Sequence, residues 1–202
     1  MPDGGATSDG GTAPGPRFTA VRRRAETDST NREALDAARA GAPEGLVVVA
    51  DHQTAGRGRD GRSWLAPPGS SLLVSVLLRP PPSLGGDRVH EVTKAAALAA
   101  ADACREVAGV EPGFKWPNDL LVGDRKLAGL LAEAEWDGHG GLAALVVGLG
   151  LNVNWPAELP VELDDIAVAL NHVVGHPVDR DALLDAFLRN FAARYERACE
   201  NG

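Results

Sequence analysis

The chain has 202 residues, of which 44% are hydrophobic, so one domain with a sizeable core is expected. Its formal net charge of -8 excludes general nucleic-acid binding, because phosphate contacts require a surplus of lysine and arginine. Cys104 and Cys199 lie in no metal-binding motif and are expected as free thiols in a reducing compartment. The chain has neither a signal-peptide pattern nor the roughly 18 to 20 apolar residues of a membrane helix, so we expect a cytoplasmic protein without a membrane partner.

The beginning of the chain divides into a tail and a folded part. Residues 1–16 are rich in glycine and proline and predict a disordered tail, while residues 17–202 predict one folded domain. Thr30 and Glu33 stand at capping-box spacing, which predicts a helix over residues 31–40 that ends before a glycine. The polar residues just before this helix are therefore expected at its N-terminus.

Two apolar runs in the first half predict buried strands. Residues 46–51 are rich in β-branched side chains, and a glycine- and arginine-rich loop over 54–63 follows them. The second strand is expected over 71–78, where three prolines end it because proline cannot donate a ladder hydrogen bond. An alanine-rich helix is then expected over about 87–107.

The second half predicts an antiparallel meander followed by helix. Strands are expected over 115–122, 127–136 and 142–153, separated by turns at glycine and aspartate. A stripe of large apolar residues from 183 to 195, spaced by three and four, predicts a closing helix against the sheet. The predicted class is α+β, with a mixed, largely antiparallel sheet and helices mainly on one face. No GxGxxG motif opens a helix, which disfavours a Rossmann fold.

The loop from Gly56 to Trp64 concentrates positive charge in an otherwise acidic chain. It holds Arg57, Arg59 and Arg62 with three glycines. Glycine lets the backbone approach a ligand, and guanidinium groups bind phosphate or carboxylate oxygens in pairs. Such a string alone is also typical of a solvated turn, but the tryptophan suits a nucleotide base. We therefore predict an anion site.

A second motif, Lys115-Trp116-Pro117-Asn118-Asp119, precedes Lys126 on the next predicted strand. Regular alternation places Lys126 on one face with Ala128, Leu130, Ala132 and Ala134, and Leu127 on the other with Glu133 and Glu135. A lysine on an apolar face either reaches solvent at the strand end or needs an anionic partner inside the structure. The proline-containing segment alone also fits an ordinary turn.

The third motif is Gly-Leu-Gly-Leu-Asn-Val-Asn over residues 148–154. Alternation puts Gly148, Gly150 and Asn152 on a common face. Two glycines on one strand face indicate a place where a ligand or another backbone packs closely, and a close helix contact is the competing explanation.

Together these motifs resemble biotin–protein ligases. The Ser-Thr-Asn helix start, the arginine-rich run ending in tryptophan, the Lys-Trp-Pro-Asn-Asp box with Lys-Leu-Ala-Gly-Leu-Leu after it, and Gly-Leu-Asn-Val-Asn occur in that order from about Glu26 to Asn154. Each box alone is weak, whereas all four in order are highly specific. The resemblance implies a catalytic domain related to class II aminoacyl-tRNA synthetases and lipoate ligases. It further implies formation of biotinyl-5'-AMP from biotin and ATP, followed by transfer to a lysine of a biotin carboxyl carrier protein domain.

The resemblance also assigns residues to ligands. The biotin set is Ser29, Thr30, Asn31, Gln53, Arg57, Gly58, Arg59 and Lys126. The nucleotide set is Arg57, Arg59, Arg62, Trp64, Asn118 and Asn152. Hydroxyl and amide side chains suit the ureido ring of biotin, because the ring offers one carbonyl and two N–H groups.

The expected chemistry explains the cations. Two anions, the biotin carboxylate and the α-phosphate of ATP, must meet, so positive charge has to neutralise them. Lys126 is the expected central cation, with Lys115 and either Arg57 or Arg59 sharing the phosphate charge. Mg²⁺ is expected with the triphosphate and not in a site built from the protein's own residues. Asp119 is a candidate proton acceptor during transfer, although a turn-capping role competes with it.

Departures from the family pattern set further expectations. Asp60 replaces a basic residue that relatives often carry, which lowers the positive charge of the loop. The chain shows neither the helix-turn-helix domain nor the C-terminal β-barrel of larger relatives, so we expect no repressor role and weaker ATP binding or transfer. A monomer or weak homodimer is expected. The rivals are a lipoate or octanoate enzyme on the same scaffold, and a module that binds the adenylate without turnover.

Overall fold

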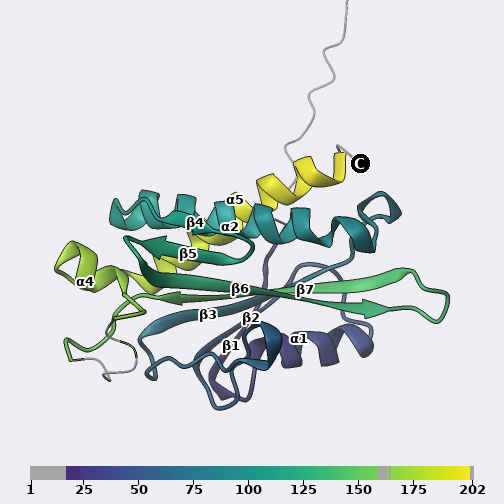
Figure 1. Ribbon diagram of the computed structural model, residues 1–202. Coiled ribbons are helices and arrows are strands. Elements are labelled where there is room, and N and C mark those ends of the chain that lie inside the picture. Colours follow the sequence, from purple (N-terminus) through teal and green to yellow (C-terminus); the bar gives the residue numbers. More distant parts are fainter. Residues whose placement is uncertain (1–16, 159–162, 164, 201–202) are drawn as a thin grey trace, which may run out of the picture.

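The computed structural model describes residues 17–158, 163 and 165–200, so the predicted tail lies outside the described residues. Within them, seven strands form one sheet in the order β1-β2-β3-β7-β6-β5-β4 (Figure 1). The strands are β1 (Ala20–Thr27), β2 (Leu46–Gln53), β3 (Ser71–Leu78), β4 (Gly113–Lys115), β5 (Asp119–Val122), β6 (Arg125–Trp136) and β7 (Leu142–Asn152). β1 and β2 are parallel, and the other neighbours pair antiparallel. The prediction of a mixed, largely antiparallel sheet is confirmed.

Helices cover the two faces of this sheet unequally. α2 (Val89–Ala108) and α5 (Arg180–Glu200) lie together on one face, and α1 (Thr30–Arg39) lies on the other (Figure 1). α4 (Leu170–Val174) is short and precedes α5. Most of the helical surface is therefore on one face, as predicted. None of the described helices has the length and apolar character needed to cross a membrane.

The side chains of β2 alternate between the two faces of the sheet, and both sets are buried. Val47 and Val49 belong to the core beneath α2 and α5, whereas Leu46 and Val48 pack against α1. Fully burying a side chain of this size contributes roughly 1.5–3 kcal/mol, so both faces stabilise the strand. The α1 face is covered only in part, and the remainder of that face carries the candidate site.

In the N-terminal part, the predicted capping box is wrong and one strand was missed. The cap of α1 is Ser29, whose hydroxyl accepts from the Arg32 N–H at 3.5 Å, and not Thr30. Glu33 pairs with Arg24 at 2.7 Å in place of closing a capping box. The edge strand β1 was not predicted, because its exposed, arginine-rich sequence has no apolar alternation.

The single strand expected over 115–122 is also wrong. The chain forms β4, turns through Trp116, Pro117 and Asn118, and returns as β5, with Lys115 paired to Asp119. The Trp116–Pro117 peptide is cis. The turn carries the polar residues of the second motif toward the open part of the α1 face.

The face predicted for Lys126 is wrong because the β5–β6 ladder is irregular. Leu120 pairs with Ala128 and Leu121 pairs with Lys126, which leaves Leu127 as an extra residue. Such a bulge interrupts the alternation of side chains. Leu127 and Ala128 are both in the core under the helices. Lys126 instead joins the face that carries Glu133, where its side chain lines the cavity described next.

Candidate active site

A cavity of about 520 Å³ opens on the α1 face of the sheet. This size is within the range of small-molecule sites, about 300–1,000 Å³. Thirteen predicted site residues line it: Ser29, Thr30, Asn31, Gln53, Arg57, Gly58, Arg59, Arg62, Trp64, Lys115, Asn118, Asp119 and Lys126. Asn152 is not among its lining residues. Segments that are far apart in the sequence therefore meet at one place.

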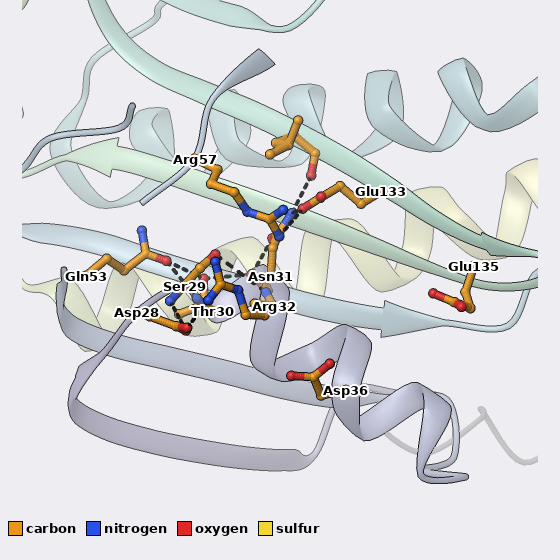
Figure 2. A network of polar contacts seen from close by, with 12 residues as sticks. Asp28, Ser29, Thr30, Asn31, Arg32, Asp36, Gln53, Arg57, Glu133 and Glu135 are labelled. Carbon is orange, nitrogen blue, oxygen red and sulfur yellow. Dashed lines mark hydrogen bonds and ion pairs between the residues drawn. The ribbon is translucent and has the colours of Figure 1, made fainter. Parts of the chain in front are cut away.

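The N-terminus of α1 supplies a buried polar cluster. Ser29, Thr30 and Asn31 are 2%, 4% and 5% exposed. The backbone N–H and the hydroxyl of Thr30 lie 2.7 and 2.9 Å from Gln53 Oε1. Asn31 Nδ2 donates to Glu133 Oε2 at 2.7 Å, which ties the helix start to β6 (Figure 2). Buried polar groups held in this way present defined donors and acceptors to a ligand.

The arginine-rich loop folds over the same cluster. An isolated bridge joins Arg57 to Ser63, and the Gly58 N–H donates to the Arg62 carbonyl at 2.7 Å. Arg57 Nη2 lies 3.0 Å from Glu133 Oε2, so the carboxylate that holds α1 also holds the loop (Figure 2). Asp60 has φ +56°, a left-handed conformation that aspartate tolerates better than most residues.

The Trp64 ring packs closely against two glycines of the sheet. A Cβ at Gly150 would be 2.4 Å from Trp64 Cε2, and one at Gly129 would be 2.9 Å from Trp64 Cζ3. These glycines pair with each other across β6 and β7. Trp64 Nε1 is buried and has no acceptor among the described residues, so a ligand that moves the ring or supplies an acceptor gains a hydrogen bond.

The two explanations left open for the glycine motif can now be separated by position. A Cβ at Gly148 would lie 2.1 Å from Asn31 Oδ1, so this glycine gives room to the start of α1. Gly150 gives room to Trp64 instead. Both glycines also line the cavity. Close packing of side chains therefore accounts for them in the present arrangement, at the same surface that a ligand would contact.

Lys126 lies between an anion and an aromatic ring. Its Nζ is 2.8 Å from Asp119 Oδ1 and 5.4 Å from the centre of the Trp64 ring. Its backbone is fixed, since its N–H donates to the Ile166 carbonyl at 2.8 Å and its carbonyl accepts from the Val168 N–H at 3.0 Å. Lys126 is thus paired with Asp119 at the cavity and not on the apolar face from which a partner was expected, and this cation is held where it can meet an anionic ligand.

Asn118 and Asn152 both brace the backbone of β6. Asn118 Nδ2 donates to the Leu130 carbonyl at 2.9 Å, and its Oδ1 lies 3.4 Å from Arg59 Nη1. Asn152 Nδ2 donates to the carbonyls of Lys126 and Val168 at 3.2 and 3.0 Å. Asn118 lines the cavity, whereas Asn152 does not and is connected to it through the Lys126 backbone.

The charges in the cavity suit an anionic ligand. Five cations line it, Arg57, Arg59, Arg62, Lys115 and Lys126, against the two carboxylates Asp60 and Asp119. The described residues contain no group of three or more histidine, cysteine, aspartate or glutamate side chains that could hold a metal ion. The carboxylates at the cavity are Asp60 and Asp119, and one or two carboxylates are what Mg²⁺ bound to phosphates takes from a protein.

Two residues of the site were missed at the level of sequence. Ser75 is completely buried on β3, and its hydroxyl contacts Thr30 Oγ1 at 2.7 Å and Asn31 Oδ1 at 2.6 Å. Glu133 joins Asn31 to Arg57. A serine inside an otherwise apolar strand was a usable signal for Ser75, because a buried hydroxyl needs a polar partner. Glu133 offered no comparable signal.

Comparison with known proteins identifies the family to which this fold and cavity belong. The model of the biotin/lipoate A/B protein ligase family matches residues 24–152, which is more than half of the chain. The chain therefore belongs to this family. Its sheet and helices match the catalytic domains of biotin protein ligases of known structure.

Individual relatives narrow the comparison to biotin enzymes. The chain is 37% identical over 175 residues to the bifunctional ligase/repressor BirA of Bacillus subtilis, covering 86% of this chain and 53% of that protein. It is 38% identical over 182 residues to the biotin–[acetyl-CoA-carboxylase] ligase of Mycobacterium tuberculosis, covering 84% and 62%. The chain thus spans about half to three fifths of the length of these relatives.

A solved structure gives the same result in three dimensions. The biotin protein ligase of Aquifex aeolicus in complex with biotin and ATP superposes with a TM-score of 0.78 and 31% sequence identity, covering 91% of this chain and 73% of that one.

Proposed function

We propose that the protein is an ATP-dependent biotin–protein ligase that forms biotinyl-5'-AMP and transfers biotin to a lysine of a biotin carboxyl carrier protein domain. The observation that carries the proposal is one cavity in which Lys126 and the arginine-rich loop adjoin a buried cluster of hydroxyl and amide groups. The cations suit the two reacting anions, and the cluster suits a polar ring.

In the first half-reaction a biotin carboxylate oxygen attacks the α-phosphorus of ATP. A new phosphorus–oxygen bond forms, the bond to the β-phosphate breaks, and pyrophosphate leaves. Lys126 is the proposed central cation, and Arg59 and Lys115 share the phosphate charge. Their effect is electrostatic, since fixed cations lower the repulsion between the two anions and stabilise charge that develops in the transition state.

The biotin ring is proposed to lie against Ser29, Thr30, Asn31 and Gln53. The Gln53 oxygen already accepts from Thr30, so its Nε2 group remains as a donor for the ureido carbonyl. Arg57 and Gly58 cover the ring from the loop, and Arg59 and Lys126 meet the carboxylate end.

The nucleotide is proposed to occupy the side of the cavity nearer Trp64. The indole covers the adenine, and Arg57, Arg59 and Arg62 contact phosphate oxygens. Asn118 lies beside Arg59 and completes this wall. Asn152 contributes by holding the Lys126 carbonyl. Mg²⁺ would accompany the triphosphate and neutralise part of its charge.

In the second half-reaction a carrier lysine amine attacks the acyl carbonyl of the adenylate. An amide bond forms, AMP leaves, and the amine loses a proton. Asp119 is the proposed proton acceptor, because its carboxylate lines the cavity, where it lies 2.8 Å from Lys126 Nζ. The partner is a carrier domain, the proposed compartment is the cytoplasm, and the proposed state is a monomer or weak homodimer.

The test is incubation of the protein with biotin, ATP, Mg²⁺ and a carrier domain. Pyrophosphate release and carrier-bound biotin are followed separately, so that each half-reaction has its own readout. We expect both. Biotin binding without pyrophosphate release would instead indicate a sensing module.

Lipoate in place of biotin tests the main rival. The cluster of Ser29, Thr30 and Gln53 favours a polar ring over the apolar tail of lipoate, because unmatched buried polar groups are costly. Pyrophosphate release with lipoate but not with biotin would overturn the proposed substrate.

A further inference from the structure

Four polar groups from three segments form a chain of oxygen contacts under the cavity. Gln53 Oε1 lies 2.9 Å from Thr30 Oγ1, Thr30 Oγ1 lies 2.7 Å from Ser75 Oγ, and Ser75 Oγ lies 2.6 Å from Asn31 Oδ1. Ser75 is completely buried, and Thr30 and Asn31 are nearly so. Each contact is short enough for a hydrogen bond, provided that a proton lies in it.

The amide at each end of this chain is fixed with its oxygen inward. At one end, Gln53 Oε1 must face Thr30, because it accepts the backbone N–H of Thr30 at 2.7 Å. At the other end, Asn31 Nδ2 must face outward, because it donates to Glu133 Oε2 at 2.7 Å and to the Leu131 carbonyl at 3.2 Å. A carboxylate and a carbonyl can only accept hydrogen bonds, so neither would tolerate the flipped amide.

The protons available to these four oxygens can therefore be counted. Three oxygen contacts need three protons, but only the hydroxyls of Thr30 and Ser75 lie between the two inward oxygens. Each hydroxyl has one proton. One contact is left with two oxygens facing each other, and one buried acceptor lacks a donor. A ligand N–H that reaches this cluster supplies the missing proton.

We propose that Glu133 is a positioning residue that, together with Ser75, keeps this cluster one donor short and so selects a ligand that presents an N–H. This inference rests on the proposed function, in which the ligand is biotin and the donor is one of its ureido N–H groups. Glu133 acts through Asn31 and does not line the cavity (Figure 2).

Removal of the Glu133 carboxylate is expected to let the Asn31 amide reverse, so that it donates a hydrogen bond into the cluster. In Glu133→Ala only the Leu131 carbonyl opposes a flip of the Asn31 amide, and the flipped amide donates to Ser75. Three protons then serve three contacts, and a ligand N–H is no longer required. Glu133→Gln is the conservative variant, because both Asn31 and Arg57 contact a single oxygen of Glu133 and glutamine can keep one oxygen there.

Glu135, two residues after Glu133 on β6, provides a matched control. Glu135 Oε2 accepts from Arg39 Nη2 at 2.8 Å and from Arg39 Nε at 3.1 Å, so it ties β6 to the other end of α1. Glu135 lies farther along β6 than Glu133 (Figure 2), and it does not line the cavity. Glu135→Ala therefore removes a comparable link between strand and helix without touching the cluster.

The experiment measures dissociation constants by calorimetry for biotin and for its two analogues that are methylated at one ureido nitrogen. The readout is the ratio of analogue to biotin constants, since any steric effect of the methyl group is common to all variants. We expect this ratio for one analogue to fall about fivefold to tenfold in Glu133→Ala, the size of one hydrogen bond. Glu133→Gln and Glu135→Ala are expected to keep the wild-type ratio.

A ratio that is equal in wild type and Glu133→Ala would overturn the inference and leave Glu133 with only a structural role. Equal weakening of all ligands would overturn it as well. If Glu133→Ala does not fold, as judged by circular dichroism, Glu133→Leu keeps the bulk without an acceptor and carries the same expectation. Failure of the proposed function is distinct, because the wild-type protein would then bind no biotin at all.

Discussion

Lys126 Nζ and Asp119 Oδ1 lie 2.8 Å apart although the two residues are not opposite each other in the ladder. Asp119 pairs with Gly129, and Lys126 pairs with Leu121. The extra residue at Leu127 turns the Lys126 side chain to the cavity face, where Asp119 is its nearest anion. In a regular strand Lys126 would lie on the helix-covered face with Ala128.

This pair leads to the first prediction, which concerns Lys126→Ala. The variant should fold normally and lose adenylate formation by about a hundredfold or more, because removal of one group that stabilises transition-state charge typically has this effect. Pyrophosphate exchange measures the activity, and thermal unfolding measures the fold. Lys126→Arg keeps the charge and serves as the control. Undiminished exchange in Lys126→Ala would show that another cation has the central role.

The second prediction concerns Gly148 and Gly150, which lie at the proposed biotin end and the proposed nucleotide end of the cavity. A methyl group at residue 148 would meet Asn31 Oδ1 at 2.1 Å, whereas one at residue 150 would meet the Trp64 ring at 2.4 Å. Gly148→Ala should therefore raise KM for biotin more than KM for ATP, and Gly150→Ala should do the reverse. Steady-state kinetics with each substrate varied in turn gives both values.

Gly109→Ala provides the control for this pair, because a Cβ at residue 109 would have open space around it and the residue is outside the cavity. Its left-handed φ of +65° makes it a test of general destabilisation. If both cavity variants change the two KM values equally, the proposed division between biotin and nucleotide is wrong.

The sequence predicted those features of the site that depend on local pattern. The Ser-Thr-Asn motif near the start of α1, the arginine-rich loop and the glycines of β7 are recognisable as motifs, and the cavity brings them together. Alternation also predicted that Gly148 and Gly150 share a face. Local spacing determines these relationships, so one sequence suffices for them.

Other features depend on pairing between distant segments and were wrong or missed. One extra residue at Leu127 reversed the face of Lys126, and alternation cannot reveal a bulge that the partner strand creates. The strand β1 is stabilised by pairing with β2 and has no apolar pattern of its own. The role of Glu133 depends on its contacts with Asn31 and Arg57, which lie far from it in the sequence, so no local pattern indicated it.

The third prediction concerns Arg79, which holds the end of α1 against the sheet. Its guanidinium donates to the carbonyls of Ala38, Ala42 and Ala143 at 2.8 to 3.2 Å. Removing it leaves several partly buried carbonyls without a donor. Arg79→Ala should lower the free energy of unfolding by about 1.5–3 kcal/mol, the range for hydrogen bonds to a charged group.

Urea unfolding followed by circular dichroism measures this change. Arg189→Ala is the control, because Arg189 is mostly exposed and pairs with Glu106 at the surface. Exposed ion pairs contribute about 0–1 kcal/mol, so this variant should be close to wild type. Similar losses in the two variants would mean that the Arg79 contacts add nothing beyond a surface charge.

The fourth prediction concerns Tyr195, the one tyrosine in the chain. Its ring is completely buried, and its hydroxyl donates to Glu44 Oε2 at 3.4 Å. Burial, with the negative charge of Glu44 added, raises the pKa of the phenol far above its ordinary range. The folded state therefore holds this proton more tightly than the unfolded state does.

The sign of the pH dependence follows from this difference. The contribution of Tyr195 to stability is fully present below the unfolded pKa of about 10 and is lost as pH rises above it. We expect tyrosinate absorbance in the near ultraviolet to appear only together with loss of the helical circular dichroism signal.

Burial also raises the pKa of the Cys104 thiol to about 12, which adds a similar alkaline loss of stability. Tyr195→Phe keeps Cys104, so the difference between its alkaline unfolding curve and that of wild type reports the phenol together with its contact to Cys199. Tyrosinate absorbance that rises near pH 10 in a protein with unchanged helix content would contradict the prediction.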